Sequence, residues 1–84
     1  MAKIELYSST RCPYCVKAKA LLDEKGVSYQ LIDITDDDEA RKDLVAKANG
    51  LRTVPQIFID ERHIGGCDDL YALERAGELD ALLK

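Results

Sequence analysis

The motif Cys12-Pro13-Tyr14-Cys15 follows a short alternating apolar segment, residues 3–7, and precedes a run with helical spacing that starts at Val16. Proline is favoured in the first turn of a helix, because its missing N–H would be unpaired there anyway and its fixed φ suits the helix. The motif therefore predicts a helix in which Pro13 is the first residue and Cys12 is the N-cap.

The two cysteines of this motif are predicted to have different roles. A sulfur at the N-cap lies against the free N–H groups of the first turn, where a thiolate is stabilised relative to a thiol. Cys12 is therefore the predicted nucleophile. Cys15 falls on the same side of the first turn, within disulfide distance but closer to the helix body, so it is the predicted resolving thiol.

Two other uses of these cysteines remain open from the residues alone. One is a pair of ordinary buried thiols, which would leave the proline and the polar approach loop unexplained. The other is a zinc site in which His63 and Cys67 join Cys12 and Cys15. Zinc would require the first helix and a short hairpin strand to converge on one point, so redox chemistry is the preferred interpretation. His63 is then expected on the surface of the hairpin.

Composition bounds the class of protein. The 84 residues, 46% hydrophobic and 33% charged, predict one globular domain over residues 1–84. No apolar run approaches the roughly 18 residues of a membrane span. The net charge of -4 argues against a nucleic-acid partner. Three cysteines are too few for a disulfide scaffold, and no secretory apolar segment precedes the first strand, so a cytoplasmic location is expected.

The first half of the chain predicts a βαβ unit. After a polar loop over residues 7–11, the first helix is expected to span residues 13–25 and to end at Gly26, where a left-handed residue is favoured. Residues 27–34, rich in β-branched and aromatic side chains, predict a parallel second strand reached by a right-handed crossover. The predicted apolar face of the helix comprises Val16, Ala18, Ala20, Leu21 and Leu22.

The second half predicts another helix followed by a hairpin. Thr35 and Asp38 resemble a capping box that starts the helix, and residues 49–50 end it. Residues 56–60 predict a strand buried on both faces, and residues 62–65 a brief edge strand paired with it.

A glycine pair, Gly65-Gly66, precedes the third predicted helix, which is expected to begin at Asp68 and Asp69. Glycines let a backbone approach a ligand closely, and the free N–H groups of a helix start suit an anion. Asp69 could accept a hydrogen bond from an ammonium beside that anion, so the motif suits an α-amino-acid end group. A plain N-cap role for Asp68 or Asp69 remains the alternative. Gly77 is expected to interrupt the helix before a last amphipathic turn.

The element order β-α-β-α-β-β-α, with the redox motif at the start of the first helix, resembles the glutaredoxins. The resemblance covers nearly the whole chain and is strongest to dithiol members from bacteria. It rests on Cys12-Pro13-Tyr14-Cys15, Thr53-Val54-Pro55 and Gly65-Gly66-Cys67-Asp68-Asp69, in the family's order and approximate spacing. It implies an α/β fold of the thioredoxin type: a four-stranded mixed sheet with the first and third helices on one face, the second on the other, and a short C-terminal helix.

The resemblance also implies a function. The protein is expected to be a glutathione-dependent thiol–disulfide oxidoreductase that reduces glutathione mixed disulfides and protein disulfides through Cys12 and Cys15. Glutathione is then a co-substrate, and no metal or organic cofactor is required. The implied partners are glutathione and glutathionylated or disulfide-bonded proteins, ribonucleotide reductase among them, with neither nucleic acid nor membrane. The expected state is a monomer.

A binding function is the alternative within the same family. Some members hold an iron–sulfur cluster between two subunits through the first cysteine and glutathione. The resemblance associates cluster binding with other residues between the cysteines, so Pro13 favours the redox enzyme. Visible absorbance after anaerobic purification would distinguish the two.

The glutathione site follows from the same resemblance. Pro55 is implied to be cis, with the Val54 backbone binding the cysteinyl part of glutathione as a one-residue strand extension; from the residues alone, Pro55 would be a plain strand opener. Many family members carry a lysine three residues before the first cysteine, where this chain has Ser9, so Arg11 and Arg52 are the predicted replacements. The predicted glutathione contacts are Arg11, Tyr14, Arg52, Thr53, Val54, Pro55, Gly66, Cys67, Asp68 and Asp69. Cys67 is expected to be a small half-buried packing residue.

Overall fold

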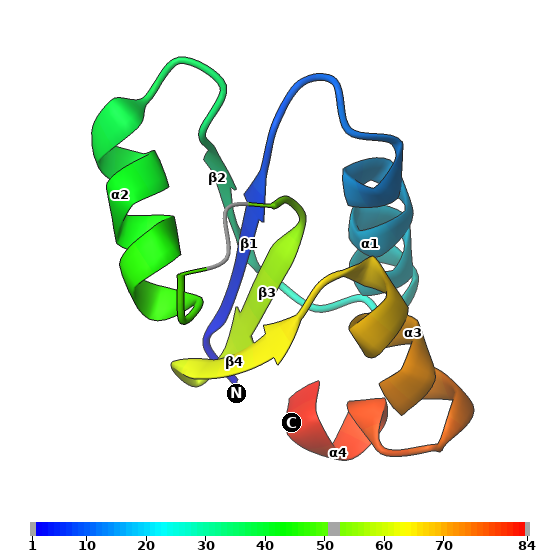
Figure 1. Cartoon of the computed structure of the whole chain (residues 1–84). Coiled ribbons are helices and arrows are strands. Elements are labelled where there is room, and N and C mark those ends of the chain that lie inside the picture. Colours follow the sequence, from blue (N-terminus) through cyan, green and yellow to red (C-terminus); the bar gives the residue numbers. More distant parts are fainter. Residues whose placement is uncertain (1, 51–52, 84) are drawn as a thin grey trace.

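The computed structural model describes residues 2–50 and 53–83, and these form a sheet flanked by helices (Figure 1). In chain order the elements are β1 (Ile4–Ser8), α1 (Pro13–Glu24), β2 (Gln30–Asp33), α2 (Asp38–Lys47), β3 (Gln56–Ile59), β4 (Arg62–Gly65), α3 (Cys67–Arg75) and α4 (Leu79–Leu83). None of the helices found in these two ranges has both the length and the apolar character needed to cross a membrane.

The sheet is mixed and has the spatial order β2-β1-β3-β4. β1 runs parallel to β2 and antiparallel to β3, and β4 pairs antiparallel with β3. The predicted βαβ unit and hairpin are confirmed. The two residues of the hairpin turn, Asp60 and Glu61, have φ values of 51° and 68°, as a type I′ turn requires.

The helices form a layer on each face of the sheet, as the resemblance implied (Figure 1). One core lies between the sheet and α1, α3 and α4, and includes Leu6, Leu22, Leu70 and Leu79. A smaller core on the other face lies under α2 and includes Tyr7, Leu44 and Phe58. The Tyr7 and Phe58 rings pack in a T-shaped arrangement with the centroids 5.6 Å apart.

Strand β1 extends beyond its predicted end. Tyr7 and Ser8, expected in the polar loop, belong to the strand and are buried. The physical reason is position: β1 is paired on both edges and covered on both faces, so side chains pointing either way lose contact with water. The loop that delivers the chain to α1 is therefore shorter than predicted.

Helix α1 confirms its predicted ends but not its predicted apolar face. Lys25 is the C-cap, and Gly26 follows with φ of 70°. Val16 and Ala20 are exposed, whereas Cys15, Ala18, Leu21 and Leu22 are buried. Val16 and Ala20 lie one and five positions after Cys15, which places both on the side of the helix turned away from the sheet.

Helix α2 begins two residues later than the capping box at Thr35 predicts. Asp37, not Thr35, is the N-cap, and its carboxylate accepts a hydrogen bond from the Ala40 N–H at 3.0 Å. The Thr35 hydroxyl is instead bonded to Asp33 and accepts from the Thr10 N–H, so a tertiary contact takes it away from the helix. The predicted end at residues 49–50 is confirmed by positive φ values at both.

Candidate functional site

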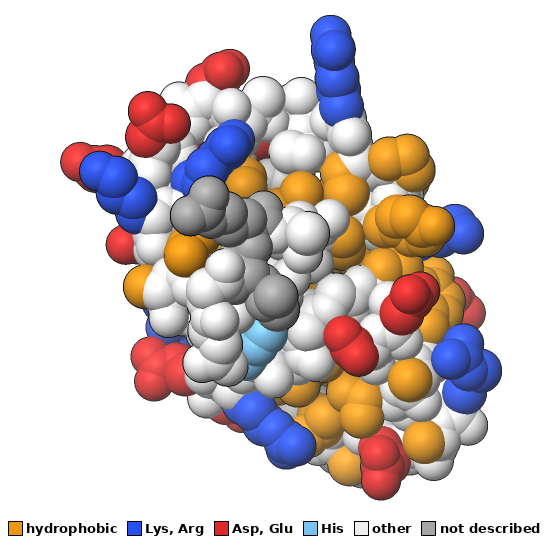
Figure 2. Space-filling model, in the orientation of Figure 1, with side chains coloured by type: hydrophobic (Ala, Val, Ile, Leu, Met, Phe, Trp, Pro, Cys, Tyr) orange, Lys and Arg blue, Asp and Glu red, His pale blue; other side chains and the backbone are white. Residues whose placement is uncertain are grey.

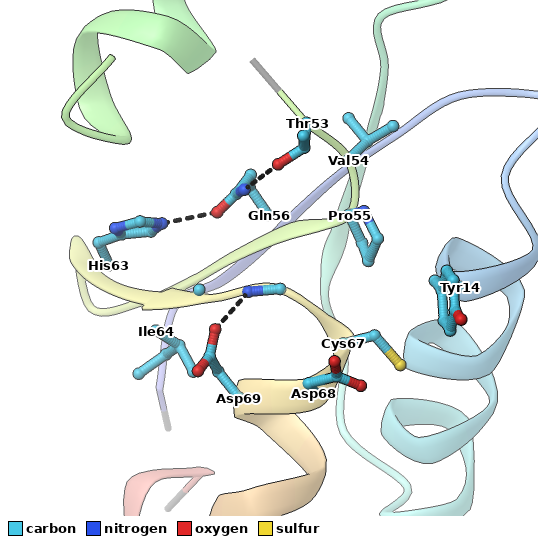
Figure 3. A pocket seen from close by; sticks show the side chains of 12 residues that line it. Tyr14, Thr53, Val54, Pro55, Gln56, His63, Ile64, Cys67, Asp68 and Asp69 are labelled. Carbon is cyan, nitrogen blue, oxygen red and sulfur yellow. Dashed lines mark hydrogen bonds between the residues drawn. The ribbon is translucent and has the colours of Figure 1, made fainter. Parts of the chain in front are cut away.

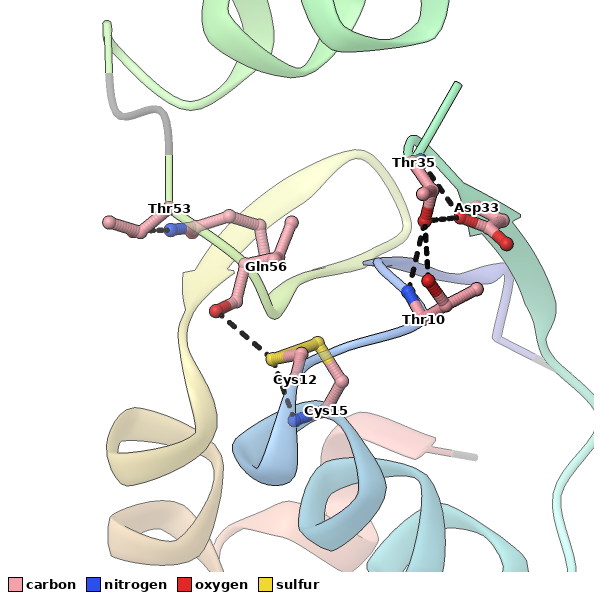
Figure 4. Close-up of a disulfide and its surroundings, with 8 residues drawn as sticks. Thr10, Cys12, Cys15, Asp33, Thr35, Thr53 and Gln56 are labelled. Carbon is pink, nitrogen blue, oxygen red and sulfur yellow. Dashed lines mark hydrogen bonds between the residues drawn. A yellow bond between two sulfur atoms is a disulfide. The ribbon is translucent and has the colours of Figure 1, made fainter. Parts of the chain in front are cut away.

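The start of α1 has the geometry that its sequence predicts. Cys12 is the N-cap, in extended conformation, and Pro13 is the first helical residue. The backbone N–H of Cys15 donates to the Cys12 sulfur at 3.1 Å. The two cysteines form a disulfide with their Cα atoms 5.1 Å apart (Figure 4). One sulfur therefore lies on the free N–H groups of the first turn, where negative charge is stabilised.

The two sulfurs differ in exposure. Cys15 is 5% exposed and belongs to the buried side of α1, whereas Cys12 is half-buried. An incoming sulfur therefore has access to Cys12 and little access to Cys15. Reactivity of a cysteine depends both on its thiolate character and on its exposure.

The loop before β3 meets this sulfur. The carbonyl oxygen of Val54 lies 3.4 Å from the Cys12 Sγ, and the Val54–Pro55 peptide bond is cis, as the resemblance implied. A Cβ placed on Gly66 would lie 3.4 Å from the Pro55 carbonyl oxygen, so the loop before α3 lies close to the loop before β3. The three motifs of the sequence thus meet at one end of the molecule.

A cleft of about 490 Å³ lies between these two loops (Figure 3). Its lining comprises Tyr14, Thr53, Val54, Pro55, Gln56, His63, Ile64, Gly65, Gly66, Cys67, Asp68 and Asp69. The cleft therefore brings together all of the predicted glutathione contacts except two. Arg11 is exposed and does not line it, and Arg52 lies outside the described residues.

The floor of the cleft on the α3 side is organised around Asp69. The backbone N–H of Gly66, the N-cap of α3, donates to the Asp69 carboxylate at 3.1 Å. α3 begins at Cys67, one residue earlier than predicted. Gly65 has φ of 122°, and a Cβ there would collide with the Asp69 carboxylate. A carboxylate offers about four acceptor positions, so capping leaves Asp69 able to accept further hydrogen bonds from a ligand.

Gln56 is a lining residue that sequence reasoning missed. Its side chain is 3% exposed, donates to the Thr53 hydroxyl at 3.0 Å and lies 2.6 Å from the His63 Nε2 (Figure 3). The available signal was a polar residue at the head of an otherwise apolar buried strand, because buried polar groups need partners.

His63 is correspondingly not a plain surface residue. Its ring stacks on Phe58 with the centroids 5.0 Å apart, and it is half-buried. Across the described ranges, no three His, Cys, Asp or Glu side chains come together in a way that could hold a metal ion. The zinc alternative therefore finds no support in the arrangement of these side chains.

Cys67 is more buried than predicted, at 5% exposure. Burial raises the pKa of the Cys67 thiol, the neighbouring Asp68 carboxylate raises it further, and Lys17 opposes the shift. The thiol is therefore held in its neutral, weakly nucleophilic form.

Comparisons with known proteins agree with this geometry. The family model described as Glutaredoxin matches residues 4–64. The chain is 57% identical to glutaredoxin 3 of Escherichia coli over 84 residues, covering 100% of both chains. It is 58% identical over 82 residues to a probable glutaredoxin of Synechocystis, covering 98% of this chain and 93% of the relative. A crystal structure of a buckwheat glutaredoxin–glutathione complex superposes with a TM-score of 0.85 at 37% identity, covering 98% of this chain and 76% of that chain.

Proposed function

The chain belongs to the glutaredoxin family and is a dithiol glutaredoxin, a glutathione-dependent disulfide reductase with a Cys12–Cys15 pair, and from this premise we propose how its residues divide the work. Cys12 attacks and Cys15 resolves. The observation that carries the proposal is the Cys12 sulfur itself, which accepts the Cys15 N–H at 3.1 Å and lies 3.4 Å from the Val54 carbonyl at the cleft.

Each exchange conserves sulfur and electrons. The Cys12 thiolate attacks one sulfur of a substrate disulfide, a Cys12–substrate disulfide forms, and the other substrate sulfur leaves as a thiolate that takes a proton from water. The Cys15 thiolate then attacks Cys12, releasing the second substrate thiolate and forming the Cys12–Cys15 disulfide. Two glutathione thiolates reverse that bond in succession and leave as glutathione disulfide, so two electrons pass from glutathione to substrate.

A glutathione mixed disulfide needs only the first cysteine. Cys12 attacks the glutathione sulfur and the protein thiolate leaves. A second glutathione then attacks the sulfur of the bound glutathionyl group, which forms glutathione disulfide and restores the Cys12 thiolate.

The cleft is the proposed glutathione site, with the contacts predicted from sequence. The Val54 backbone would pair with the cysteinyl residue of glutathione, since its carbonyl already adjoins the reactive sulfur. The N–H groups at the start of α3 would receive the γ-glutamyl carboxylate, and Asp69 its ammonium group. This placement is supported by the similarity to the buckwheat protein, whose structure is a glutathione complex.

Thr53, Pro55, Gly66, Cys67 and Asp68 would complete the walls of this site, and Tyr14 would lie along the bound tripeptide. Arg11 and Arg52 stay the proposed cationic contacts for the glycyl carboxylate. The proposed protein partners are glutathionylated and disulfide-bonded proteins, and the proposed location is the cytoplasm, where glutathione keeps thiols reduced.

The direct experiment is reduction of the mixed disulfide of glutathione and mercaptoethanol, followed as NADPH consumption in the presence of glutathione reductase. The wild-type protein should turn it over with saturation in the mixed disulfide. A protein that reduces it no faster than glutathione alone would contradict the proposal.

A further inference from the structure

A second hollow lies on the other flank of the redox pair. It is a groove of about 200 Å³ whose lining includes Cys15, Val16, Lys19, Leu31 and Asp33, together with the end of β1 and the loop that follows. The cleft and the groove share none of their lining residues. The cleft and the groove are therefore two different surfaces, and the proposed glutathione contacts account for the cleft alone.

Exposed apolar side chains line both hollows. Among the described residues, the large hydrophobic side chains that stay exposed are Tyr14, Val16 and Leu31, at 57%, 68% and 47%. Tyr14 lines the cleft, and the other two line the groove. Figure 2 shows hydrophobic side chains gathered over the region where α1 lies in Figure 1. Exposed apolar surface concentrated beside a reactive group is typical of an interaction site.

We infer that this groove receives an apolar side chain of a protein substrate, from the segment next to the substrate's reactive cysteine. The inference rests on the proposed function, in which glutathione occupies the cleft and leaves the groove free. A protein that exchanges a disulfide with Cys12 presents a surface wider than a tripeptide, so it covers both flanks. The groove is continuous with the redox pair because Cys15 lies in its wall.

The charges around the groove indicate that its apolar side chains, and not its charged ones, select the partner residue. Lys19 and Asp33 have opposite signs, so the groove has no net preference for an acidic or a basic residue. The Asp33 carboxylate accepts hydrogen bonds from the Thr35 hydroxyl at 2.6 Å and the Thr35 N–H at 2.9 Å. Val16 and Leu31 are left as the side chains that gain most from contact with a partner, because apolar area removed from water is what stabilises such a contact.

A groove beside Cys15 can hold a protein substrate while the substrate is joined to Cys12. Once the substrate is joined to Cys12, the Cys15 thiolate attacks the Cys12 sulfur and displaces the substrate thiolate. Contact with Val16 and Leu31 holds the substrate before and during that exchange without entering the chemistry. Glutathione mixed disulfides of small thiols do not reach the groove, so their reduction does not depend on it.

The test uses two synthetic peptides, each closed by one intramolecular disulfide and identical except that both cysteines are flanked by leucine in one and by serine in the other. The wild-type protein should reduce the leucine peptide with the higher kcat/KM. The double variant Val16→Ser/Leu31→Ser should lose about five- to tenfold on the leucine peptide and little on the serine peptide. Reduction of the glutathione–mercaptoethanol mixed disulfide should stay within twofold, which also shows that the variant is folded.

Two controls separate this inference from the proposed function. Val45→Ser makes the same chemical change on α2, away from the redox pair, and should keep the leucine preference. Asp69→Asn should slow the glutathione reaction but should also keep the preference for the leucine peptide. The inference is overturned if the double variant retains the leucine preference, if the wild type has none, or if the glutathione reaction falls equally. An unchanged glutathione reaction in Asp69→Asn would instead count against the proposed cleft.

Discussion

The Cys12 sulfur and the Val54 carbonyl oxygen lie 3.4 Å apart, although 42 positions separate the two residues. Val54 and the first residues of α3 both line the cleft, so this contact places the Cys12 sulfur beside the proposed glutathione site. Chemistry and recognition therefore reside in different elements, and substitutions can disturb one while sparing the other.

Removing the charge of Asp69 should weaken the binding of glutathione without changing the chemical step at Cys12. Asp69→Asn keeps an oxygen that can accept the Gly66 N–H but loses the negative charge proposed to face the glutathione ammonium. We expect KM for the glutathione–mercaptoethanol mixed disulfide to rise about tenfold with little change in kcat, because hydrogen bonds to charged groups contribute roughly 1.5–3 kcal/mol.

A matched control for Asp69 exists on the other face of the sheet. Asp37→Ala removes the N-cap of α2, which should cost about 1 kcal/mol of unfolding free energy and leave KM unchanged. An unaltered KM in Asp69→Asn would remove Asp69 from the glutathione site.

Gly65→Ala should damage both stability and the cleft. Its φ of 122° is unfavourable for alanine, and the new Cβ would collide with the Asp69 carboxylate. Gly77→Ala is the comparison, since Gly77 also has positive φ, of 74°, but a Cβ there meets nothing within 4 Å. Urea unfolding should show a loss of about 1 kcal/mol for Gly77→Ala and at least about 2 kcal/mol for Gly65→Ala. Equal losses would mean that the collision with Asp69 is absent.

The third cysteine should resist alkylation. Burial raises the pKa of the Cys67 thiol, so the thiolate that iodoacetamide requires is scarce at neutral pH. Mass spectrometry of the reduced protein should find Cys12 modified first and Cys67 modified slowly, at a rate that increases as the pH is raised. Modification of Cys67 as fast as Cys12 at pH 7 would show that the thiol is exposed and ionised.

The raised pKa of Tyr29 should make the free energy of unfolding decrease at high pH. Burial, together with its hydrogen bond to Asp23 at 2.8 Å, raises the pKa of Tyr29 to about 12. An unfolded tyrosine ionises near pH 10. The contribution of Tyr29 to the free energy of unfolding is therefore complete below about pH 10 and is lost between about pH 10 and 12, where unfolding releases a proton. Urea unfolding at pH 9 and pH 11 should show a smaller decline for Tyr29→Phe than for the wild type. Identical declines would contradict the raised pKa.

Helix ends that depend only on neighbouring residues could be predicted from the sequence. Pro13 and Cys12 mark the start of α1, and Gly26 marks its end. The identity of the α2 cap could not be read in the same way. Thr35 and Asp37 are both good capping residues, and the choice depends on Thr10, which lies 25 positions from Thr35 and occupies its hydroxyl.

Contacts between distant segments account for what sequence reasoning did not reach. Val16 has the character of a core residue, but the direction in which α1 meets the sheet leaves it exposed. Gln56 and His63 support each other within the hairpin, a pairing that depends on the register of β3 and β4. The approach of Val54 to Cys12 follows from no local signal, since no spacing rule relates a helix cap to a loop before a distant strand.

The central claim is that Cys12 is the nucleophile and Cys15 the resolving thiol, because Cys12 caps α1 in contact with Val54 of the cleft and Cys15 is buried one turn inward. The measurement is the rate of two reactions, reduction of the glutathione–mercaptoethanol mixed disulfide and reduction of a peptide disulfide, in Cys12→Ser and Cys15→Ser. Cys12→Ser should lose both reactions, because a serine hydroxyl is not ionised near neutral pH. Cys15→Ser should keep the first and lose most of the second, whose release step needs a neighbouring thiol at high effective concentration. Substantial activity in Cys12→Ser, or equal loss of the first reaction in both variants, would contradict the assignment.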